Sequence, residues 1–313
     1  MKLVGQSPLF LAATRSLARM ARFDVPVLIE GETGTGKELA ARVVHYRSER
    51  RRGPFIPVNC GALPDTLVEN ELFGHERGAY TDARERLPGV VALAEGGTLF
   101  LDEINALPPK AQAALLRFLQ DQRYRPLGAS DERRANVRII AATNKCLEQL
   151  VERGEFRSDL FFRIKILFVT LPPLRARAGD AMLLAEHFLD ECASRFHAPR
   201  KRLGKQTQAS LERYQWPGNV RELENVIVRE SLMTDGPELV WVTESSSFAA
   251  QLIPPYAAAK AAAVADFDRR FLCELLRRAA GNVTRAAAEA GKDRRALGRL
   301  VKKYGLRPLD FKP

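Results

Sequence analysis

The 313-residue chain is long enough for two or three domains, and its 49 Lys and Arg against 38 Asp and Glu give a net charge of +11 that favours a polyanionic partner. Four scattered cysteines argue against a zinc site or a disulfide framework, and no apolar run approaches the ~20 residues that span a bilayer. Arg15, Arg19 and Arg22 interrupt any N-terminal signal-peptide core, so we expect a soluble cytoplasmic protein.

The first strong motif is a glycine-rich loop between an apolar strand at Pro26–Ile29 and a helix that begins near Lys37. Glycines let consecutive backbone N–H groups point at one anion, and the helix N-terminus adds partial positive charge. Lys37 would bring a full charge to the β- and γ-phosphates. Glu38 stands where most such loops carry a Ser or Thr hydroxyl for magnesium. The motif predicts ATP binding by Gly31, Glu32, Thr33, Gly34, Thr35, Gly36, Lys37 and Glu38.

Two carboxylates, Asp102 and Glu103, end a second hydrophobic run that we expect to form a strand at Thr98–Asp102. In a parallel sheet the carboxyl ends of the strands meet at one edge, so this pair should lie beside the phosphate loop. Asp102 is suited to hold Mg²⁺, directly or through water, and Glu103 is suited to polarise the attacking water. The pair therefore predicts hydrolysis of the bound ATP.

Strand-like and helix-like segments alternate as far as residue 172, which predicts a mostly parallel α/β sheet with helices on both faces. The expected strands are Pro26–Ile29, Phe55–Asn59, Thr98–Asp102, Val137–Thr143 and Ile166–Thr170, and the expected helices include Pro109–Gln120, Asp180–Phe196, Gln206–Tyr214 and one from Asn219 to about Thr234. We expect an α/β ATPase core at 1–172, a helical lid at 173–236, a linker at 237–263 and a helical domain at 264–313.

Seven stretches of residues 1–236 resemble, in order, the AAA+ central domain of bacterial enhancer-binding proteins, the ATPases that remodel sigma-54 RNA polymerase. They are Gly31–Glu38, Val58–Cys60, Glu71–Glu76, Ala94–Glu103, Ala141–Asn144, Phe156–Arg163 and Trp216–Leu223. Glu38 is that family's own variant at the end of the loop. The resemblance implies an AAA+ fold with a helical lid, ATP and Mg²⁺ as ligands, and a ring oligomer, by resemblance a hexamer.

The resemblance also assigns roles to single residues. Asn59 matches the polar residue that restrains the catalytic glutamate, and Thr143-Asn144 resembles the first sensor of the γ-phosphate. Arg157 and Arg163 match arginine fingers, which a neighbouring subunit supplies, and Arg221 resembles the second sensor on the lid. For each arginine a surface salt bridge is the alternative. Further ATP contacts are implied at Ala94, Glu95, Gly96, Gly97, Thr98, Leu99, Phe100, Leu101, Asp102 and Glu103.

A loop in this family carries Gly-Ala-Phe-Thr-Gly-Ala at its tip and engages sigma-54. The aligned residues here are Gly78, Ala79, Tyr80, Thr81, Asp82 and Ala83. Tyr80 keeps the aromatic ring, but Asp82 narrows the backbone choices that glycine allows and adds a negative charge. The alternative to sigma-54 remodelling is therefore a relative that regulates transcription without sigma-54.

The chain ends in a basic helical segment, with thirteen basic and six acidic residues between Ala263 and Pro313. A capped helix that ends at Gly291 and a second helix at Arg294–Lys303 resemble the Fis-type helix-turn-helix domain of these activators. A merely solvated basic helix is the alternative. Lys292 in the turn and Gly298 inside the second helix depart from the family pattern. The expected DNA contacts are Thr284, Arg285, Arg294, Arg295, Arg299, Lys302 and Lys303.

The sequence thus predicts an ATP-hydrolysing transcription regulator that assembles into a ring, binds a double-stranded enhancer site and remodels sigma-54 RNA polymerase. Two alternatives stay open: a DNA-binding regulator that acts without sigma-54, and one whose nucleotide site only builds the oligomer. A clamp-loader-like or helicase motor is disfavoured by the loop at Gly78–Ala83 and by the tail. No receiver or ligand-sensing domain precedes residue 1, so we expect either a regulatory partner in trans or a longer native protein.

Overall fold

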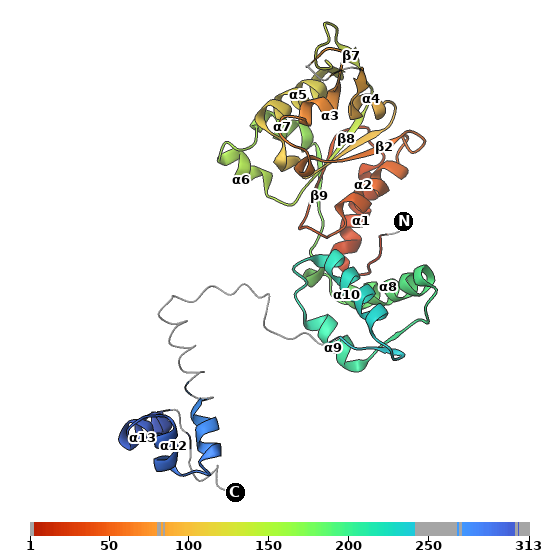
Figure 1. Cartoon of the computed structure of the whole chain (residues 1–313). Coiled ribbons are helices and arrows are strands. Elements are labelled where there is room, and N and C mark those ends of the chain that lie inside the picture. The colour runs from red at the N-terminus through yellow and green to blue at the C-terminus, as the bar shows by residue number, and fades with distance from the viewer. Residues whose placement is uncertain are drawn as a thin grey trace. The chain divides into compact units, whose positions relative to one another are not determined.

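The computed structural model describes residues 3–79, 83, 85–241, 268, 271–303 and 306. The chain divides into two compact units, Met1–Thr243 and Glu244–Pro313. Figure 1 shows the elements of both units. Among the described residues, no helix has both the length and the apolar character needed to cross a membrane.

The first unit is built on a five-stranded parallel sheet with the order β2-β5-β8-β1-β9. The strands alternate their side chains between two apolar layers, so that Leu28 and Leu99 face one layer while Ile29 and Phe100 face the other. Both layers are apolar because helices cover both faces, as the sequence predicts. The strands are β1 (Val27–Glu30), β2 (Phe55–Asn59), β5 (Thr98–Asp102), β8 (Arg138–Thr143) and β9 (Leu167–Thr170).

Of the described helices, two cover one face of the sheet and five cover the other (Figure 1). Leu17 and Val44 bring the first pair onto the layer that contains Ile29, and Phe118 and Leu160 belong to the opposite layer. The pair is α1 (Pro8–Met20) and α2 (Lys37–Tyr46); the others are α3 (Val68–Phe73), α4 (Val90–Leu93), α5 (Pro109–Asp121), α6 (Leu147–Glu152) and α7 (Ser158–Ile164). The two groups therefore lie on opposite sides of the central sheet.

Short elements connect these layers. Two-residue strands pair as antiparallel hairpins, and single 3-10 turns follow β2 and β5. They are β3 (Gly74–His75) with β4 (Leu87–Pro88), β6 (Arg123–Tyr124) with β7 (Arg133–Arg134), η1 (Cys60–Ala62) and η2 (Ile104–Ala106).

A helical lid follows the sheet in the same unit. Trp216 is 1% exposed and stacks on Trp241, with ring centroids 5.2 Å apart, in the centre of the lid's own apolar core. Its helices are α8 (Asp180–Phe196), α9 (Lys205–Arg213) and α10 (Asn219–Met233), with η3 (Leu174–Ala176), β10 (Arg202–Leu203) and β11 (Glu238–Leu239). This core extends to Trp241, five residues beyond the lid boundary that we expect from the sequence.

The second unit contains a helix over 271–278, α12 (Val283–Glu289) and α13 (Arg294–Lys303). Asn282 caps α12, because its Oδ1 accepts the backbone N–H groups of Thr284 at 3.0 Å and Arg285 at 3.2 Å. Leu276, Ala286 and Leu297 belong to one small apolar core. The sequence predicts the bounds of α13 and the capped start of α12 correctly, whereas most of the expected linker, 242–263, lies outside the described residues.

Candidate nucleotide site at the carboxyl edge of the sheet

The phosphate loop, Gly31–Glu38, leaves the carboxyl end of β1 and enters α2. Gly34 and Gly36 have φ values of +81° and +93°, a region that residues with a β-carbon seldom adopt. The Lys37 side chain is 8% exposed, and its ammonium donates to the carbonyl oxygens of Gly31 at 2.8 Å and Glu32 at 3.0 Å. The lysine is therefore already folded over the concave side of the loop, where its charge faces an incoming anion.

Glu38 at the end of the loop does not face the anion position. Its carboxylate accepts from Arg42, one helical turn further along α2, at 2.8 Å. This pair explains why a carboxylate is tolerated beside a phosphate site, since the Arg42 guanidinium neutralises it.

Asp102 and Glu103 lie at the carboxyl end of β5, in the same sheet edge as the loop. Asp102 Oδ1 accepts the backbone N–H of Glu103 at 3.0 Å. Glu103 has φ +53° and ψ +45°, a left-handed conformation that is uncommon for a residue with a side chain and often marks a functional site. The strained backbone turns the Glu103 carboxylate toward the end of β2.

Asn59 and Gly61 receive that carboxylate at the end of β2. A β-carbon at Gly61 would lie 2.2 Å from Glu103 Oε2, so only glycine lets the carboxylate approach so closely. The Asn59 Oδ1 atom accepts the Gly61 N–H at 2.8 Å and lies on the same side of Gly61. The structure thus brings Asn59 and Glu103 to one place, as the resemblance implies, although Asn59 bonds to the backbone rather than to the carboxylate.

Charges from three elements meet at Lys37. Burial lowers the pKa of Lys37, the carboxylates of Asp102 and Glu103 oppose that shift, and the Arg221 guanidinium adds to it. These influences require all three charged side chains to lie near the lysine, because interactions between charges fall with distance. The loop, the carboxylates and the lid arginine therefore form one site.

Asn144 reaches the loop from the neighbouring strand β8, which pairs with β1 at Glu30 and Thr143. Its Nδ2 donates to Thr33 Oγ1 at 3.2 Å, and the Gly31 N–H donates to the Thr143 carbonyl oxygen at 3.2 Å. The amide expected to sense the γ-phosphate thus touches the loop that would hold it.

The lid closes over the loop through the start of α10. The N–H of Val220 donates to the Gly34 carbonyl oxygen at 3.0 Å, and a β-carbon at Gly34 would collide with the Gly218 oxygen at 2.2 Å and meet Arg221 Cβ at 3.2 Å. Fully buried Asn219, at φ +54°, donates to the Thr33 oxygen at 3.0 Å. Arg221 is therefore held against the phosphate loop, as expected of a second sensor.

A second lid contact involves Glu32 and Arg175. The guanidinium hydrogen bond lowers the pKa of Glu32 to about 2, with a further contribution from Asn219. Glu32 is thus ionised over the physiological pH range and ties the loop to η3.

Arg157 and Arg163 lie away from the loop of their own chain, on the α7 face of the sheet, whereas α2 covers the other face. Arg157 is exposed and pairs with Asp159 at 2.7 Å, and exposed Arg163 donates to the Leu119 carbonyl oxygen at 3.3 Å. Neither contacts the nucleotide loop of the same chain in the described residues. The arrangement leaves both guanidinium groups on the surface.

The nucleotide contacts expected at Ala94 to Leu101 are not found, because these residues lie away from the phosphate loop. The peptide before β5 is at the amino end of that strand, so Gly97 lies at least ~13 Å along the strand from the edge that carries Asp102. Thr98 to Leu101 are at most 1% exposed inside the sheet. Of the stretch Ala94–Glu103, the structure brings only Asp102 and Glu103 to the loop.

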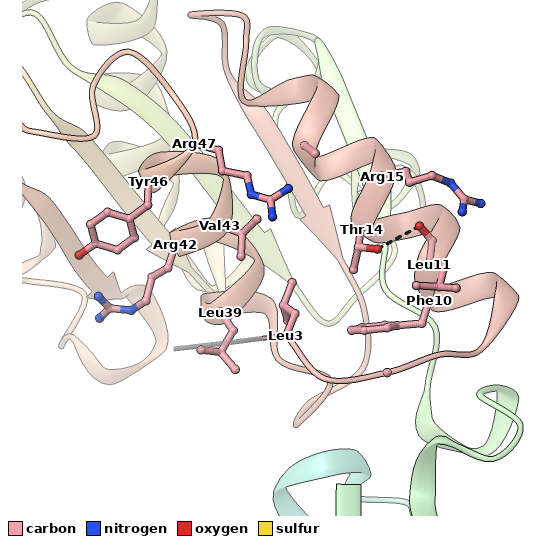
Figure 2. Close-up of a pocket in the computed structure, with 12 residues that line it drawn as sticks. Leu3, Phe10, Leu11, Thr14, Arg15, Leu39, Arg42, Val43, Tyr46 and Arg47 are labelled. Atoms are coloured by element: carbon pink, nitrogen blue, oxygen red, sulfur yellow. Dashed lines mark hydrogen bonds between the residues drawn. The ribbon is translucent and has the colours of Figure 1, made fainter. Parts of the chain in front are cut away.

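The structure also shows a cavity of about 520 Å³ that the sequence does not predict, between α1 and α2 (Figure 2). Leu39, in the first turn of α2, lines it together with Val43, Leu3 and Phe10. Apolar residues on two helices are read from sequence as core, so no local signal distinguishes them as the lining of a pocket.

The residues expected to contact sigma-54 and DNA are described in part. Tyr80, Thr81 and Asp82 lie outside the described residues; at the base of their loop the Gly78 N–H donates to the Ala83 carbonyl oxygen at 2.8 Å, and Ala79 packs against Gly128. In the second unit the expected DNA contacts are all exposed, whereas Leu297 and Val301 of α13 are buried. They are Thr284, Arg285, Arg294, Arg295, Arg299, Lys302 and Lys303.

A magnesium ion fits the donor atoms of this edge. Asp102 offers a second carboxylate oxygen that no hydrogen bond from the described residues occupies. Mg²⁺ prefers oxygen ligands and is commonly held by one or two carboxylates together with substrate phosphates and water. Asp102 is therefore the residue that would hold the ion, while Glu38 is engaged by Arg42.

Comparisons with family models, with curated proteins and with solved structures all indicate the same family. A family model described as the sigma-54 interaction domain matches residues 3–170, and one described as an AAA+ ATPase lid domain matches residues 175–251. Regulatory protein AtoC of Escherichia coli K12 is 41% identical over 320 residues, which cover 98% of this chain and 68% of the relative. The DNA-binding transcriptional regulator NtrC of Azospirillum brasilense is 48% identical over 227 residues, covering 72% of this chain and 47% of the relative. The crystal structure of NtrX from Brucella abortus in complex with ATP has a TM-score of 0.75 at 32% identity and covers 98% of this chain and 70% of its own.

Proposed function

Because this chain belongs to the sigma-54 interaction domain family of AAA+ proteins, we propose that it hydrolyses ATP in a ring oligomer in order to remodel sigma-54 RNA polymerase. One observation carries the proposal. Three segments, which carry the Asp102–Glu103 pair, Asn144 and Arg221, converge on the phosphate loop that contains Lys37. A loop that only bound a nucleotide would not require the Asp102–Glu103 pair.

ATP binds with its phosphates against the loop. The backbone N–H groups at the start of α2 face the anion, and the Lys37 ammonium exchanges the carbonyl oxygens of Gly31 and Glu32 for phosphate oxygens. The adenine base enters the Leu39 end of the cavity between α1 and α2, because that end is both apolar and two residues from Lys37. Arg221 on the lid then closes over the phosphates.

Hydrolysis depends on Glu103. Its carboxylate orients the attacking water toward the γ-phosphate and accepts a proton from that water. Asn59 and Gly61 fix the position of the carboxylate. Asp102 would hold Mg²⁺, which would supply positive charge to offset the negative charge of the phosphates. Asn144 contacts Thr33 in the loop and so responds to what the loop holds.

The site is completed by a second subunit. Arg157 and Arg163 stand on the surface of α7 and do not reach the loop of their own chain, so they act as fingers on the neighbour's ATP. A surface that faces a different surface on the next copy generates a ring when the rotation closes. The family resemblance favours six subunits.

The remaining partners are duplex DNA and the polymerase. The exposed basic side of α13, with its apolar side buried in a small helical core, fits a helix-turn-helix reader that binds an enhancer site. The Gly78–Ala83 loop contacts sigma-54. Asp82 at its tip favours the second candidate, a family member that regulates transcription through DNA without sigma-54, with ATP serving mainly to assemble the ring.

Mixed subunits test the ATPase and its shared sites together. Lys37→Ala and Arg157→Ala chains should each be inactive alone, because one lacks phosphate binding and the other lacks the finger. In a random 1:1 mixture, about a quarter of the subunit contacts pair an intact Lys37 with an intact Arg157, so about a quarter of wild-type phosphate release should return. Arg153→Ala, an exposed arginine four residues earlier, is the control and should remain near wild type. A mixture as inactive as its components would contradict finger exchange between subunits.

A further inference from the structure

Six exposed arginines gather at the carboxyl ends of the two helices that cover one face of the sheet. On α1 and the turn after it, Arg15, Arg19 and Arg22 are spaced by four and three residues, which places them along one side of a helix over about 10 Å. Arg47, Arg51 and Arg52 follow directly from α2. We call these six residues the arginine face.

Two hollows show that the two rows are neighbours. Arg15 and Arg47 line the cavity between α1 and α2, and Figure 2 shows Arg47 reaching from α2 into the gap between the helices while Arg15 extends from α1. Arg22 and Arg52 line a second hollow of about 340 Å³ at the ends of the same helices. Between them, Arg50 bonds to Asp24 at 2.7 Å and so ties the end of α2 to the segment after α1.

The positive charge of the face is not compensated. None of the six arginines forms an ion pair within the described residues, and no acidic residue occurs between Pro8 and Phe23. The carboxylate of Asp24 is taken by Arg50, which leaves Glu49 as the one free acid in the described stretch 47–52. A buried guanidinium, Arg138, lies beneath and donates to the Met20 carbonyl oxygen at 2.9 Å, which adds fixed positive charge.

We propose that the arginine face binds the phosphate backbone of double-stranded DNA, as a second DNA contact on the ATPase unit in addition to the tail. Arginine presents a planar, permanently charged fork that matches phosphate oxygens, and this face contains arginine and no lysine. Duplex DNA carries one negative charge per ~1.7 Å, which suits a row of unpaired cations better than a short acidic peptide does. The contact is independent of base sequence, because arginines that bind phosphate oxygens do not read the base edges.

The test separates this face from the tail. In full-length chain carrying Arg294→Ala, Arg295→Ala and Arg299→Ala, binding to a fluorescent duplex of arbitrary sequence is measured by anisotropy while the salt concentration is raised. Adding Arg19→Ala, Arg22→Ala, Arg51→Ala and Arg52→Ala should weaken binding at least about tenfold, and the slope of log K against log salt should fall by about 0.9 for each phosphate that the protein no longer neutralises. Arg15 and Arg47 are left intact because they line the cavity beside the ATP loop.

A matched variant removes the same charge elsewhere. Lys110→Ala, Arg117→Ala, Lys205→Ala and Arg213→Ala lie on α5 and α9, are exposed, and should change the affinity less than about twofold. The double variant Arg19→Glu and Arg51→Glu lowers the net charge by as much as the quadruple alanine variant. It replaces the quadruple variant if that variant does not fold. DNA affinity and salt slope equal to those of the control would overturn the proposal, as would a tail-neutralised parent that does not bind the duplex. ATP hydrolysis should be unchanged in either case, which keeps this outcome separate from the fate of the proposed ATPase.

Discussion

At the scale of single residues, Asp180 connects the N-terminal segment to the lid. Its carboxylate, which is 1% exposed, accepts the N–H groups of Gln6 at 2.7 Å and Ser7 at 3.0 Å and the guanidinium of Arg177 at 2.8 Å. Arg177 in turn lies over the Phe10 ring and donates to the Val4 carbonyl oxygen at 2.8 Å. The segment that borders the cavity between α1 and α2 is therefore fixed to the lid by one buried ion pair.

Asp180→Asn should lower the free energy of unfolding by about 3 kcal/mol, because it leaves the buried Arg177 guanidinium without its counter-charge. Urea unfolding of the full chain measures this loss. Asp190 lies on the same helix as Asp180 and is an exposed partner of Arg200. The Asp190→Asn change should lower the free energy of unfolding by less than about 1 kcal/mol. Equal losses for the two variants would contradict a structural role for Asp180.

The effect of Asp180→Asn should also depend on pH. Burial raises the pKa of Asp180, but hydrogen bonds from Gln6, Arg177 and Ser7 outweigh it, so the folded pKa is lower than the ordinary value of 3.8. A lowered carboxylate pKa stabilises the fold above the unfolded value and loses that contribution as the pH falls through the folded value. The difference between wild type and variant should therefore be constant near neutral pH and shrink below about pH 4.

Lys37, Asp102 and Glu103 could be predicted from sequence because each belongs to a short local pattern of strand, turn and helix. Asp180 and Arg177 could not, since their partners Gln6 and Val4 are 174 and 173 residues away in the chain. The nucleotide contacts expected at Ala94–Leu101 failed for a related reason. A sequence stretch that resembles a family motif includes the whole strand. Only the carboxyl end of β5 lies beside the phosphate loop.

At the scale of elements, α13 contains a glycine that nothing in its surroundings requires. Gly298 lies inside Arg294–Lys303, where a β-carbon would meet no heavy atom within 4 Å, and its φ is not in the left-handed region. Glycine in a helix interior costs about 1 kcal/mol relative to alanine. We therefore expect α13 to be less stable than the same helix with alanine at position 298.

Gly298→Ala should slow amide hydrogen exchange in α13 about fivefold, which corresponds to about 1 kcal/mol of added local stability. Gly154→Ala is the matched control, because it also has open space but has φ +72°, where alanine is strained. Exchange around Gly154 should become faster. Unchanged or faster exchange in α13 of the Gly298 variant would contradict this explanation of the helix.

The long elements follow closely from the sequence, and the short ones do not. Phe55–Asn59, Thr98–Asp102 and Asp180–Phe196 match their expected bounds, since each is rich in apolar residues and begins directly after a proline or a glycine. The two-residue strands β3, β4, β6 and β7 are too short to carry any period. They form because tertiary contacts place two extended segments side by side.

At the scale of the whole molecule, Arg157 and Arg163 lie on the α7 side of the sheet and do not contact the phosphate loop of their own chain within the described residues. Under the proposed function, these two arginines complete the ATP site of a neighbouring copy, which would give a physical reason for assembly. The two DNA contacts that we propose, on the second unit and on the arginine face, would act together to raise the local concentration of the protein beside its DNA site.

The most direct test of the proposed sigma-54 remodelling is transcription in vitro from a sigma-54 promoter, with purified sigma-54 polymerase and ATP. The wild-type chain is compared with the Asp82→Gly and Glu103→Gln variants. We expect transcript with the wild-type chain and hydrolysable ATP, at least as much with Asp82→Gly, and none with Glu103→Gln, whose amide cannot accept a proton from water. A wild-type chain that gives no transcript, beside an Asp82→Gly chain that gives clear transcription, would contradict sigma-54 remodelling by this protein.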